Sequence, residues 1–440
     1  MSIQQVRQAL RDRLQPIKEV LAAVPGLPDM FEQCFMNTLD TTVQWDGENT
    51  FVITGDIPAM WLRDSTAQVL HYLRFADVPG VRDIIRGLIK MQVDCILYDP
   101  YANAFNKTPH PGWDPTDLPK KKELVWERKY EIDSLCYPVW LMQQYAECTG
   151  QYDFLDENCL KALRTIVDLF RVEQWHEDSD YYFIRTNCPP SDTLSHDGRG
   201  APVGYTGMTW CGFRPSDDAC QYGYLVPSNL FAAHILAHVA GFAERAGDEQ
   251  LARDARKLHG EISNGVRQHG IVQHPTHGSI YAYEVDGLGN HNLMDDANVP
   301  SLLSLPYLRV CAKDDPLYLA TRAFVLSPGN PYYSTGKYAR GIGSPHTPPG
   351  YIWHIALSIQ AMTATDLDEV TEIVSMILNT HAGTGFMHEG FNPDDPAQFT
   401  RPWFAWANSL FGELIYRLYE AGTLPQVLEG LPSAGHVHET

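Results

Sequence analysis

The sequence predicts an all-α protein, a closed ring of helical hairpins of the (α/α)6 barrel type with short β-hairpins in its loops. Stretches with the 3.6-residue period of amphipathic helices recur from one end of the chain to the other. No low-complexity linker and no repeat of fixed period divides them. Short turns alternate with long loops rich in glycine, proline and aromatic residues, which is typical of a ring that collects its functional loops on one face.

The N-terminal half is expected to begin with helices over residues 3–23 and 29–42, separated by prolines. A strand at 51–54 then leads to a helix that starts at Asp64 and Ser65 and continues to Leu73. Residues 98–122 form a long loop, and long ordered loops in compact proteins are usually functional. Further helices are predicted over residues 81–97, 131–147, 156–172, 225–246 and 248–268.

The C-terminal half continues the same pattern after a hairpin near residues 279–286. Helices are predicted over residues 297–309, 315–325, 350–364, 366–380 and 403–421. Residues 425–440 are expected to form a peripheral tail. We therefore interpret residues 1–440 as a single catalytic domain, although two packed helical domains would give a similar pattern.

The amino-acid composition limits the kinds of partner that the protein is expected to bind. Charged residues make up 20% of the chain, and the formal net charge of −21 argues against nucleic acid or an anionic membrane surface. Nine cysteines without a CxxC pair, and an N-terminus of mixed charge unlike a signal peptide, favour a cytoplasmic location. No run of 18 apolar residues is present, so no membrane span is expected. The sequence leaves the oligomeric state open.

The central stretch from Thr206 to Asn229 combines an acidic pair, Asp217 and Asp218, with a crowd of aromatic residues. An acid in an aromatic wall is how carbohydrate enzymes keep a carboxyl protonated for donation. Neighbouring residues on a turn point in different directions, so one acid could enter a pocket while the other anchors the loop. The alternative is that both acids cap a structural turn.

Two further blocks have the residue types that bind sugars. The stretch GDIPAMWLRDS places Trp61, Arg63 and Asp64 together, which offers a flat apolar face with paired donors and acceptors for hydroxyls. The alternative there is an Arg–Asp pair that stabilises a helix start. In the loop after residue 181, Asn187 could bind a hydroxyl through its amide, although turn chemistry explains an asparagine equally well.

The C-terminal blocks add more candidates. His346 and Tyr351 lie in SPHTPPGYIWHIAL, where histidine and aromatic residues precede a helix and suggest a pocket. Glu389 follows His388 in the loop before the last long helix, which begins after Arg401. A single glutamate there could pair with Arg401. Together with the central aspartate, it would instead complete a set of two carboxylates from opposite halves of the chain.

Metal and cofactor motifs are weak. His234 and His238 have helical spacing but lack the glutamate of HExxH, and no phosphate-binding loop, dinucleotide motif or GxSxG elbow is present. We therefore expect neither a metal nor a cofactor.

With these blocks assembled, the chain resembles glycoside hydrolase family 125, the exo-α-1,6-mannosidases, over nearly its whole length. The resemblance implies an (α/α)6 barrel that removes terminal α-1,6-linked mannose with inversion and without a metal. By motif, Asp218 would be the general acid, with Asp217 as the neighbouring candidate, and Glu389 the general base. Where relatives commonly read HESF, this chain has Gly390. The implied sugar contacts are Trp61, Arg63, Asp64, Asn187, Arg214, Asp217, His346, Tyr351, His388 and Arg401.

Two other functions remain open from the sequence. A sugar epimerase or isomerase on the same barrel would use paired histidine bases, for which His346, His354 and His388 are candidates, but it leaves the carboxylates unexplained. A non-catalytic mannoside-binding protein would need the sugar contacts but no acid–base pair. Release of free mannose from a glycoside separates hydrolysis from both.

Overall fold

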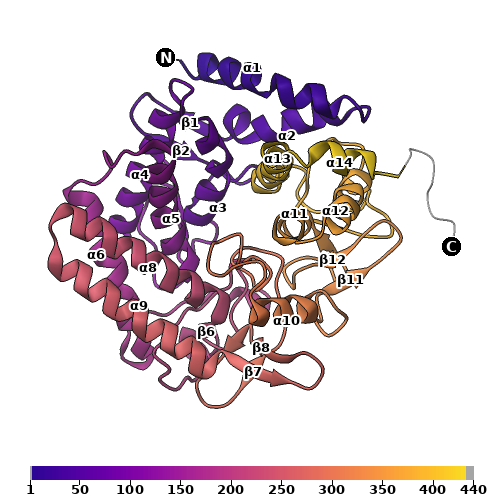
Figure 1. The fold of residues 1–440 in the computed structure, drawn as a ribbon. Helices are drawn as coiled ribbons and strands as arrows, with labels where there is room; N and C mark the ends of the chain where they lie inside the picture. Colours follow the sequence, from indigo (N-terminus) through magenta and orange to yellow (C-terminus); the bar gives the residue numbers. More distant parts are fainter. Residues whose placement is uncertain (1, 433–440) are drawn as a thin grey trace.

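Helices arranged in a ring surround a central set of loops in the computed structural model, which describes residues 2–432 (Figure 1). The chain runs once around the ring, which closes where α2 packs against α13 and α1 contacts α14. The helices are α1 (Ile3–Leu21), α2 (Leu27–Thr41), α3 (Leu62–Ala67), α4 (Val81–Tyr98), α5 (Ile132–Thr149), α6 (Glu157–Val172), α7 (Ser195–Gly198), α8 (Val226–Ala246), α9 (Glu249–His269), α10 (Pro316–Val325), α11 (His354–Thr363), α12 (Leu367–Thr380), α13 (Ala405–Glu420) and α14 (Leu424–Glu429), with 3-10 helices at Leu70–Phe75, Glu173–Asp178 and Pro190–Asp192.

The inner helices are apolar around most of their circumference, whereas the outer helices are apolar along one side. α5, α8, α11 and α13 are buried on nearly every side, which requires a helix that is apolar all round. Outer helices such as α9 bury one stripe, with Leu251, Ala255, Leu258 and Ile262 at helical spacing. α8 is long and apolar enough to cross a membrane by length and composition, and 72% of its most apolar window is buried inside the ring.

Short antiparallel strands lie in the loops between the helices, in six small sheets within the described residues. They are β1 (Val43–Trp45), β2 (Thr50–Val52), β3 (Met60–Trp61), β4 (Ala104–Phe105), β5 (Val125–Glu127), β6 (Tyr224–Leu225), β7 (Ile271–His274), β8 (Gly278–Tyr281), β9 (Glu284–Val285), β10 (His291–Asn292), β11 (Tyr333–Thr335), β12 (Arg340–Ile342), β13 (Ile352–Trp353) and β14 (Gly390–Phe391). In the sheet β3–β4–β5, Trp61 pairs with Ala104 and Ala104 with Glu127. Trp353 of β13 pairs with Gly390 of β14, which places Glu389 beside the start of α11.

The predicted helix over residues 297–309 is wrong, since this buried segment folds as a series of turns. Val299, Leu302 and Leu308 are buried with nearly the period of a helix, so the apolar pattern was correct but the conformation was not. Pro306 would remove a helical hydrogen bond and clash with the preceding turn. The carboxylate of Asp295 instead accepts bonds from the backbone N–H groups of Leu302 (2.8 Å) and Leu303 (2.9 Å).

Smaller corrections concern three other segments. The helix predicted from Asp64 to Leu73 divides into α3 and a 3-10 helix, and the hairpin near 279–286 is formed instead by β7 and β8. The tail predicted over 425–440 is not peripheral where the structure describes it, because Val427 and Leu428 of α14 are buried. Residues 433–440 of that predicted tail lie outside the described residues.

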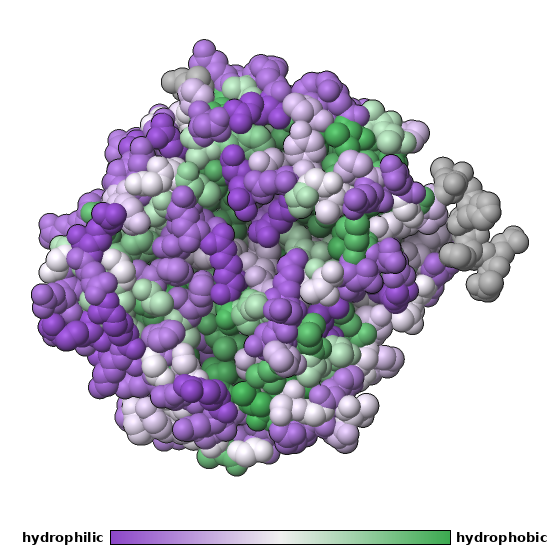
Figure 2. Space-filling model, viewed as in Figure 1, coloured by the Kyte–Doolittle hydropathy of each residue, from purple (hydrophilic) through white to green (hydrophobic). Residues whose placement is uncertain are grey.

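The face seen in Figure 2 is mostly hydrophilic, with hydrophobic atoms showing in patches near its centre and lower part. The net charge of −21 repels polyanions such as nucleic acid.

Candidate active site

A pocket of about 620 Å³ lies where the central loops meet, in the size range of small-molecule sites. Part of its wall comes from the starts of three helices. Arg63 and Asp64 lie in the first turn of α3, Trp353 directly precedes α11, and Phe404 directly precedes α13. The remaining lining residues are Thr54, Ile57, Trp61, Trp113, Trp126, Glu127, Lys129, Arg185, Pro189, Ser191, Asp192, Ser216, Asp217, Asp218, Asn298, Pro345, His346, Glu389 and Arg401.

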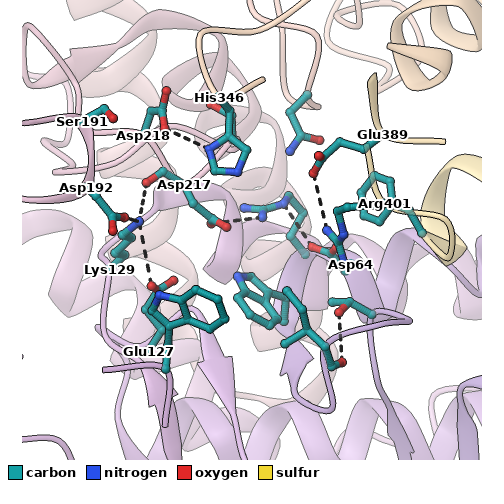
Figure 3. Close-up of a pocket in the computed structure, with 18 of the residues that line it drawn as sticks. Asp64, Glu127, Lys129, Ser191, Asp192, Asp217, Asp218, His346, Glu389 and Arg401 are labelled. Atoms are coloured by element: carbon teal, nitrogen blue, oxygen red, sulfur yellow. Dashed lines mark hydrogen bonds and ion pairs between the residues drawn. The ribbon is translucent and has the colours of Figure 1, made fainter. Parts of the chain in front are cut away.

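The structure brings most of the predicted site residues into this pocket. Those that line it are Trp61, Arg63, Asp64, Asp217, Asp218, His346, Glu389 and Arg401. They come from both halves of the chain, as predicted for the two carboxylates. Figure 3 shows Asp218 and Glu389 apart, with the His346 ring between them in this view.

Four predicted sugar contacts do not line the pocket. Asn187 is exposed and has a left-handed backbone conformation (φ +58°), which asparagine tolerates in loops. Tyr351 lies outside the lining, where its backbone N–H donates to the Pro348 carbonyl (3.2 Å). Residue type identified both as candidates, but it does not say which way a loop presents its side chain.

The other two have supporting positions behind the wall. Arg214 Nε donates to Glu284 Oε1 (2.6 Å), and its backbone N–H donates to the Asp218 carbonyl (2.7 Å), so it fixes the acidic turn. His388 is fully buried and its ring stacks on Phe399 at 3.7 Å between centroids. Burial lowers the pKa of His388, which keeps its ring neutral.

The acidic pair occupies a tight turn closed by a bridge between Phe213 and Ala219. Asp217 has a positive φ of +68°, and this left-handed residue turns the chain so that both acids line the pocket. Ser216 Oγ donates to Asp296 Oδ2 (2.7 Å), which holds the turn from behind. We expected one acid to face the pocket and its neighbour only to anchor the loop. Instead, both acids line the pocket, and they have different partners.

Asp218 is buried, and His346 is its partner. The Nδ1 atom of His346 lies 3.0 Å from Asp218 Oδ1, while Asp218 Oδ2 has no hydrogen-bond partner among the described residues. Burial acts to lower the pKa of His346, but the hydrogen bond to Asp218 and the charge of Glu389 raise it from 6.5 to about 9. Near neutral pH the imidazole of His346 is therefore protonated and donates to Oδ1 of Asp218, beside the open Oδ2 atom.

We expect NMR titration to give His346 a pKa of about 9 and Asp218→Asn to return it toward 6.5. Because the folded pKa exceeds the ordinary value, this contact stabilises the fold fully below pH 6.5 and ceases to do so as pH rises through about 9. The chemical shift of the His346 ring protons over pH 5–10 is the measurement. A wild-type value near 6.5 would contradict the pairing.

Glu389 lies on the other side of the pocket with a different set of neighbours. Its Oε2 accepts a bond from Thr400 Oγ1 (3.0 Å), and its Oε1 lies 3.5 Å from Arg401 Nη1. Arg401 in turn donates from Nε to Asp56 Oδ1 (3.0 Å), so the guanidinium is fixed from the opposite end of the chain. These contacts fix the Glu389 carboxyl in the pocket wall.

Gly390 packs closely behind Glu389. A β-carbon at this position would lie 3.2 Å from Cγ2 of Thr347 and 3.3 Å from Nε1 of Trp353. The serine of the related motif would therefore require Thr347 to shift by a few tenths of an ångström. The departure noted in the sequence changes this packing and leaves the Glu389 side chain in the pocket wall.

Arg63 is the buried cation at the base of the pocket. It contacts four carboxylates: Glu131 (2.6 Å), Asp133 (3.2 Å), Asp64 (3.3 Å) and Asp217 (3.4 Å). Burial raises the pKa of Asp64 and of Asp133, the latter to about 6, although Arg63 opposes both shifts. Burial also acts to raise the pKa of Asp217, but the hydrogen bond from Glu131 and the charge of Arg63 lower it below its ordinary value.

Arg63→Met should therefore destabilise the fold by about 3–5 kcal/mol at pH 7, because it leaves buried carboxylates without their cation. The loss should be smaller at pH 5, since acids whose pKa is raised in the folded state stabilise it as they take up protons. Urea unfolding at the two pH values measures this. Arg253→Met, which breaks an exposed pair with Glu249, is the control and should cost less than about 1 kcal/mol.

Sequence reasoning missed Glu127 and Lys129, which form one wall of the pocket together with Arg185 and Asp192. Lys129 Nζ donates to Asp192 Oδ1 (2.5 Å) and to the Asp217 carbonyl (2.7 Å), and Arg185 donates to Asp192 (3.0 Å) and Glu127 (2.9 Å). A signal was present, because Glu127 and Lys129 stand in a short charged run between a buried strand and the apolar helix α5. Such charges are usually exposed, and here both are buried.

Several buried polar atoms of the pocket have no hydrogen-bond partner among the described residues. They include Nε1 of Trp61, Nε1 of Trp126, Oδ2 of Asp64 and Oδ2 of Asp218. Buried polar groups are rarely left unpaired, so a concentration of them around one cavity indicates a ligand rich in hydroxyl groups. Indole donors beside carboxylate acceptors are suited to such a ligand.

Within residues 2–432 no group of three or more His, Cys, Asp or Glu side chains is placed to hold a metal ion. The pair His234 and His238 on α8 lies with its Nε2 atoms 3.2 Å apart, and neither residue lines the pocket.

Comparisons with known proteins agree with this geometry. The family model described as metal-independent α-mannosidase (GH125) matches residues 25–416. The meiotically up-regulated gene 157 protein of Schizosaccharomyces pombe is 39% identical, covering 94% of this chain and 86% of that protein. A metal-independent α-mannosidase structure from Streptococcus pneumoniae, in a non-productive complex with α-1,6-mannobiose, is 45% identical, covers 94% of this chain and 98% of that one, and superposes with a TM-score of 0.91.

A more distant likeness confirms the predicted barrel. A bacterial glucoamylase complexed with acarbose superposes with a TM-score of 0.59 at 13% identity, over 91% of this chain and 57% of that one, and so shows the fold alone. The family model, which spans most of the chain, and the two relatives above 30% identity are more specific. The chain therefore belongs to glycoside hydrolase family 125, the metal-independent α-mannosidases.

Proposed function

We propose that this protein is an inverting exo-mannosidase that removes terminal α-1,6-linked mannose from mannosides or N-glycan-derived oligosaccharides. The observation that carries the proposal is the pair of buried carboxyls, Asp218 and Glu389, which line one pocket with different partners. The linkage is supported by the Streptococcus pneumoniae relative, whose structure holds α-1,6-mannobiose.

The two carboxyls have complementary roles in this proposal. In an inverting glycosidase one carboxylic acid protonates the leaving oxygen, while the other carboxylate activates a water molecule on the opposite face of the sugar. We assign Asp218 as the donor, because its Oδ2 has no partner among the described residues and is open to the leaving oxygen, while His346 holds the carboxyl in place through Oδ1. We assign Glu389 as the base, because it lies across the pocket from Asp218 and its carboxyl is held in place by Thr400 and Arg401.

Asp217 is the weaker candidate for the acid. Its carboxylate lies between Arg63 Nη2 (3.4 Å) and Asn103 Nδ2 (3.4 Å), so all its neighbours favour the ionised form. A group whose pKa is lowered below its ordinary value carries no proton at neutral pH. We assign Asp217, with Arg63, Asp64 and Arg401, to the binding of the hydroxyls of the terminal mannose.

Digestion of α-1,2-, α-1,3- and α-1,6-mannobiose, followed by NMR of the first anomer released, tests the function. We expect cleavage of the α-1,6 isomer with β-mannose appearing first, and full activity in EDTA. Initial release of α-mannose would refute inversion. Rapid cleavage of internal bonds in a mannan backbone would refute exo action, and loss of activity on chelation would refute independence of metal.

The isomerase alternative has less support. Its histidine bases would have to face the substrate, yet His354 and His388 are buried and lie outside the pocket lining. Burial lowers the pKa of His354 to about 3, and its ring contacts the His388 carbonyl and Thr380. His346 lines the pocket, but it is paired with Asp218.

We also propose a cytoplasmic location, which the state of the thiols supports. All nine cysteines are free, and Cys211 and Cys220 remain unbonded although their sulfur atoms lie 3.9 Å apart. Reduced thiols are the rule in the cytosol. Fractionation of cells that express the tagged full chain tests this, and recovery from the culture medium would contradict it.

A further inference from the structure

We propose that Trp113, with Trp126 beside it, forms the platform that binds the saccharide on the leaving-group side of the scissile bond. The proposal rests on the function proposed above and adds to it the residues that bind the leaving sugar. Trp113 is 58% exposed although it lines the pocket, so its indole face is open to a ligand.

The loop that carries Trp113 is pinned against the pocket wall. It connects β4 to β5 and folds back along β5, where the backbone N–H of Asn106 donates to the Leu124 carbonyl (2.8 Å) and that of Trp113 to the Trp126 carbonyl (3.0 Å). Gly112 has a φ of +80°, and a β-carbon there would lie 2.2 Å from the Trp126 carbonyl oxygen. The close approach requires glycine and fixes Trp113 at the pocket mouth.

The two tryptophans form a corner rather than a flat surface. Their ring centroids lie 6.4 Å apart with the planes inclined at 49°. Trp126 is only 8% exposed, and its Nε1 has no hydrogen-bond partner among the described residues. A buried, unpaired indole donor that lines a cavity points to a ligand acceptor. One sugar satisfies both features, since its C–H face packs on Trp113 while a hydroxyl accepts from Trp126.

Trp126 directly precedes Glu127 in β5, so the corner lies on the Glu127 side of the pocket, which we assign to the leaving group. Lys129 Nζ bonds the Asp217 carbonyl, one residue from the proton donor Asp218, and Asp192, which bonds Lys129, is partly exposed. Figure 3 shows Glu127, Lys129 and Asp192 on one side of the view and Glu389, Arg401 and Asp64 on the other. The base side holds the terminal mannose, so the opposite side receives the sugar that departs with the protonated oxygen.

Trp113→Ala should lower kcat/KM for α-1,6-mannobiose about tenfold, because the lost indole face no longer covers the leaving sugar. Hydrolysis of α-mannosyl fluoride, which has no leaving sugar, should change by less than about twofold. Trp113→Phe should restore most of the mannobiose activity. Leu118→Ala is the matched control, because Leu118 is 48% exposed in the same loop but lies outside the pocket lining.

A binding measurement keeps this proposal separate from the proposed reaction. In a Glu389→Gln background, calorimetry should show that Trp113→Ala weakens α-1,6-mannobiose binding about tenfold and leaves mannose binding unchanged. Unchanged mannobiose binding, or equal losses on mannobiose and on the fluoride, would overturn the platform. Absence of mannobiose hydrolysis by the wild-type protein would refute the proposed function alone, because the binding result would still decide the role of Trp113.

Discussion

Asp218→Asn is expected to lower kcat/KM for α-1,6-mannobiose by about 10²–10⁴-fold, the usual contribution of a general acid. An asparagine keeps the size of the side chain but supplies no acidic proton to the leaving oxygen. Aryl mannosides with activated leaving groups need no protonation, so their hydrolysis should fall far less. Rates with mannobiose and with 2,4-dinitrophenyl α-mannoside, measured on the same preparation, test this selectivity.

Asp217→Asn provides the matched comparison for that result. Asp217 contacts Arg63 and Asn103 and has no role in protonation in our assignment, so its loss should weaken both substrates by similar factors. Equal losses on both substrates in Asp218→Asn, with the selective pattern in Asp217→Asn, would move the acid one residue back.

Glu389→Gln should reduce hydrolysis of both substrates alike, again by about 10²–10⁴-fold, because water must attack whichever group leaves. Glutamine can still accept a bond from Thr400 Oγ1, so the pocket should keep its shape. In Glu389→Ala, added azide should restore turnover and give β-mannosyl azide, since the vacated space admits a small nucleophile.

The control for this variant is Glu413→Gln. Glu413 is a buried acid on α13 that accepts from Arg417 Nε (2.8 Å) and Tyr307 Oη (3.0 Å), and it lies outside the pocket lining. Its loss should alter stability but not the activity of the folded protein. A Glu389→Gln enzyme that retained wild-type rates on the activated substrate would contradict the assignment of the base.

Apolar periodicity was enough to predict the ring of helices, because the long helices each bury at least one side. Outer helices such as α9 bury a single apolar stripe, and inner helices such as α8 bury most of their surface. It failed at residues 297–309, where a buried series of turns has nearly the same apolar spacing as a helix. Periodicity reports burial, and only the prolines in that segment carried information about conformation.

The candidate site was predictable where neighbouring residues act together, as in Trp61, Arg63 and Asp64. Prediction was less successful for single polar residues, because Arg214 and His388 have the residue types of sugar ligands but face partners behind the wall. Glu127 and Lys129 were missed for the opposite reason. Their charges are also balanced by residues far along the chain, Lys129 by Asp192 and Glu127 by Arg185, and local patterns do not reveal such pairs.

The ion pair between Arg401 and Asp56 joins residues 345 positions apart, and Gly55 forms a bridge with Phe404 beside it. A chain under synthesis makes its N-terminal part first, at about 5–20 residues per second. The block around Arg63 is therefore translated long before Glu389 and Arg401, which complete the same pocket. In our assignment a nascent or C-terminally truncated chain lacks both a mannose contact and the base, so we expect glycan binding and turnover only after the ring has closed.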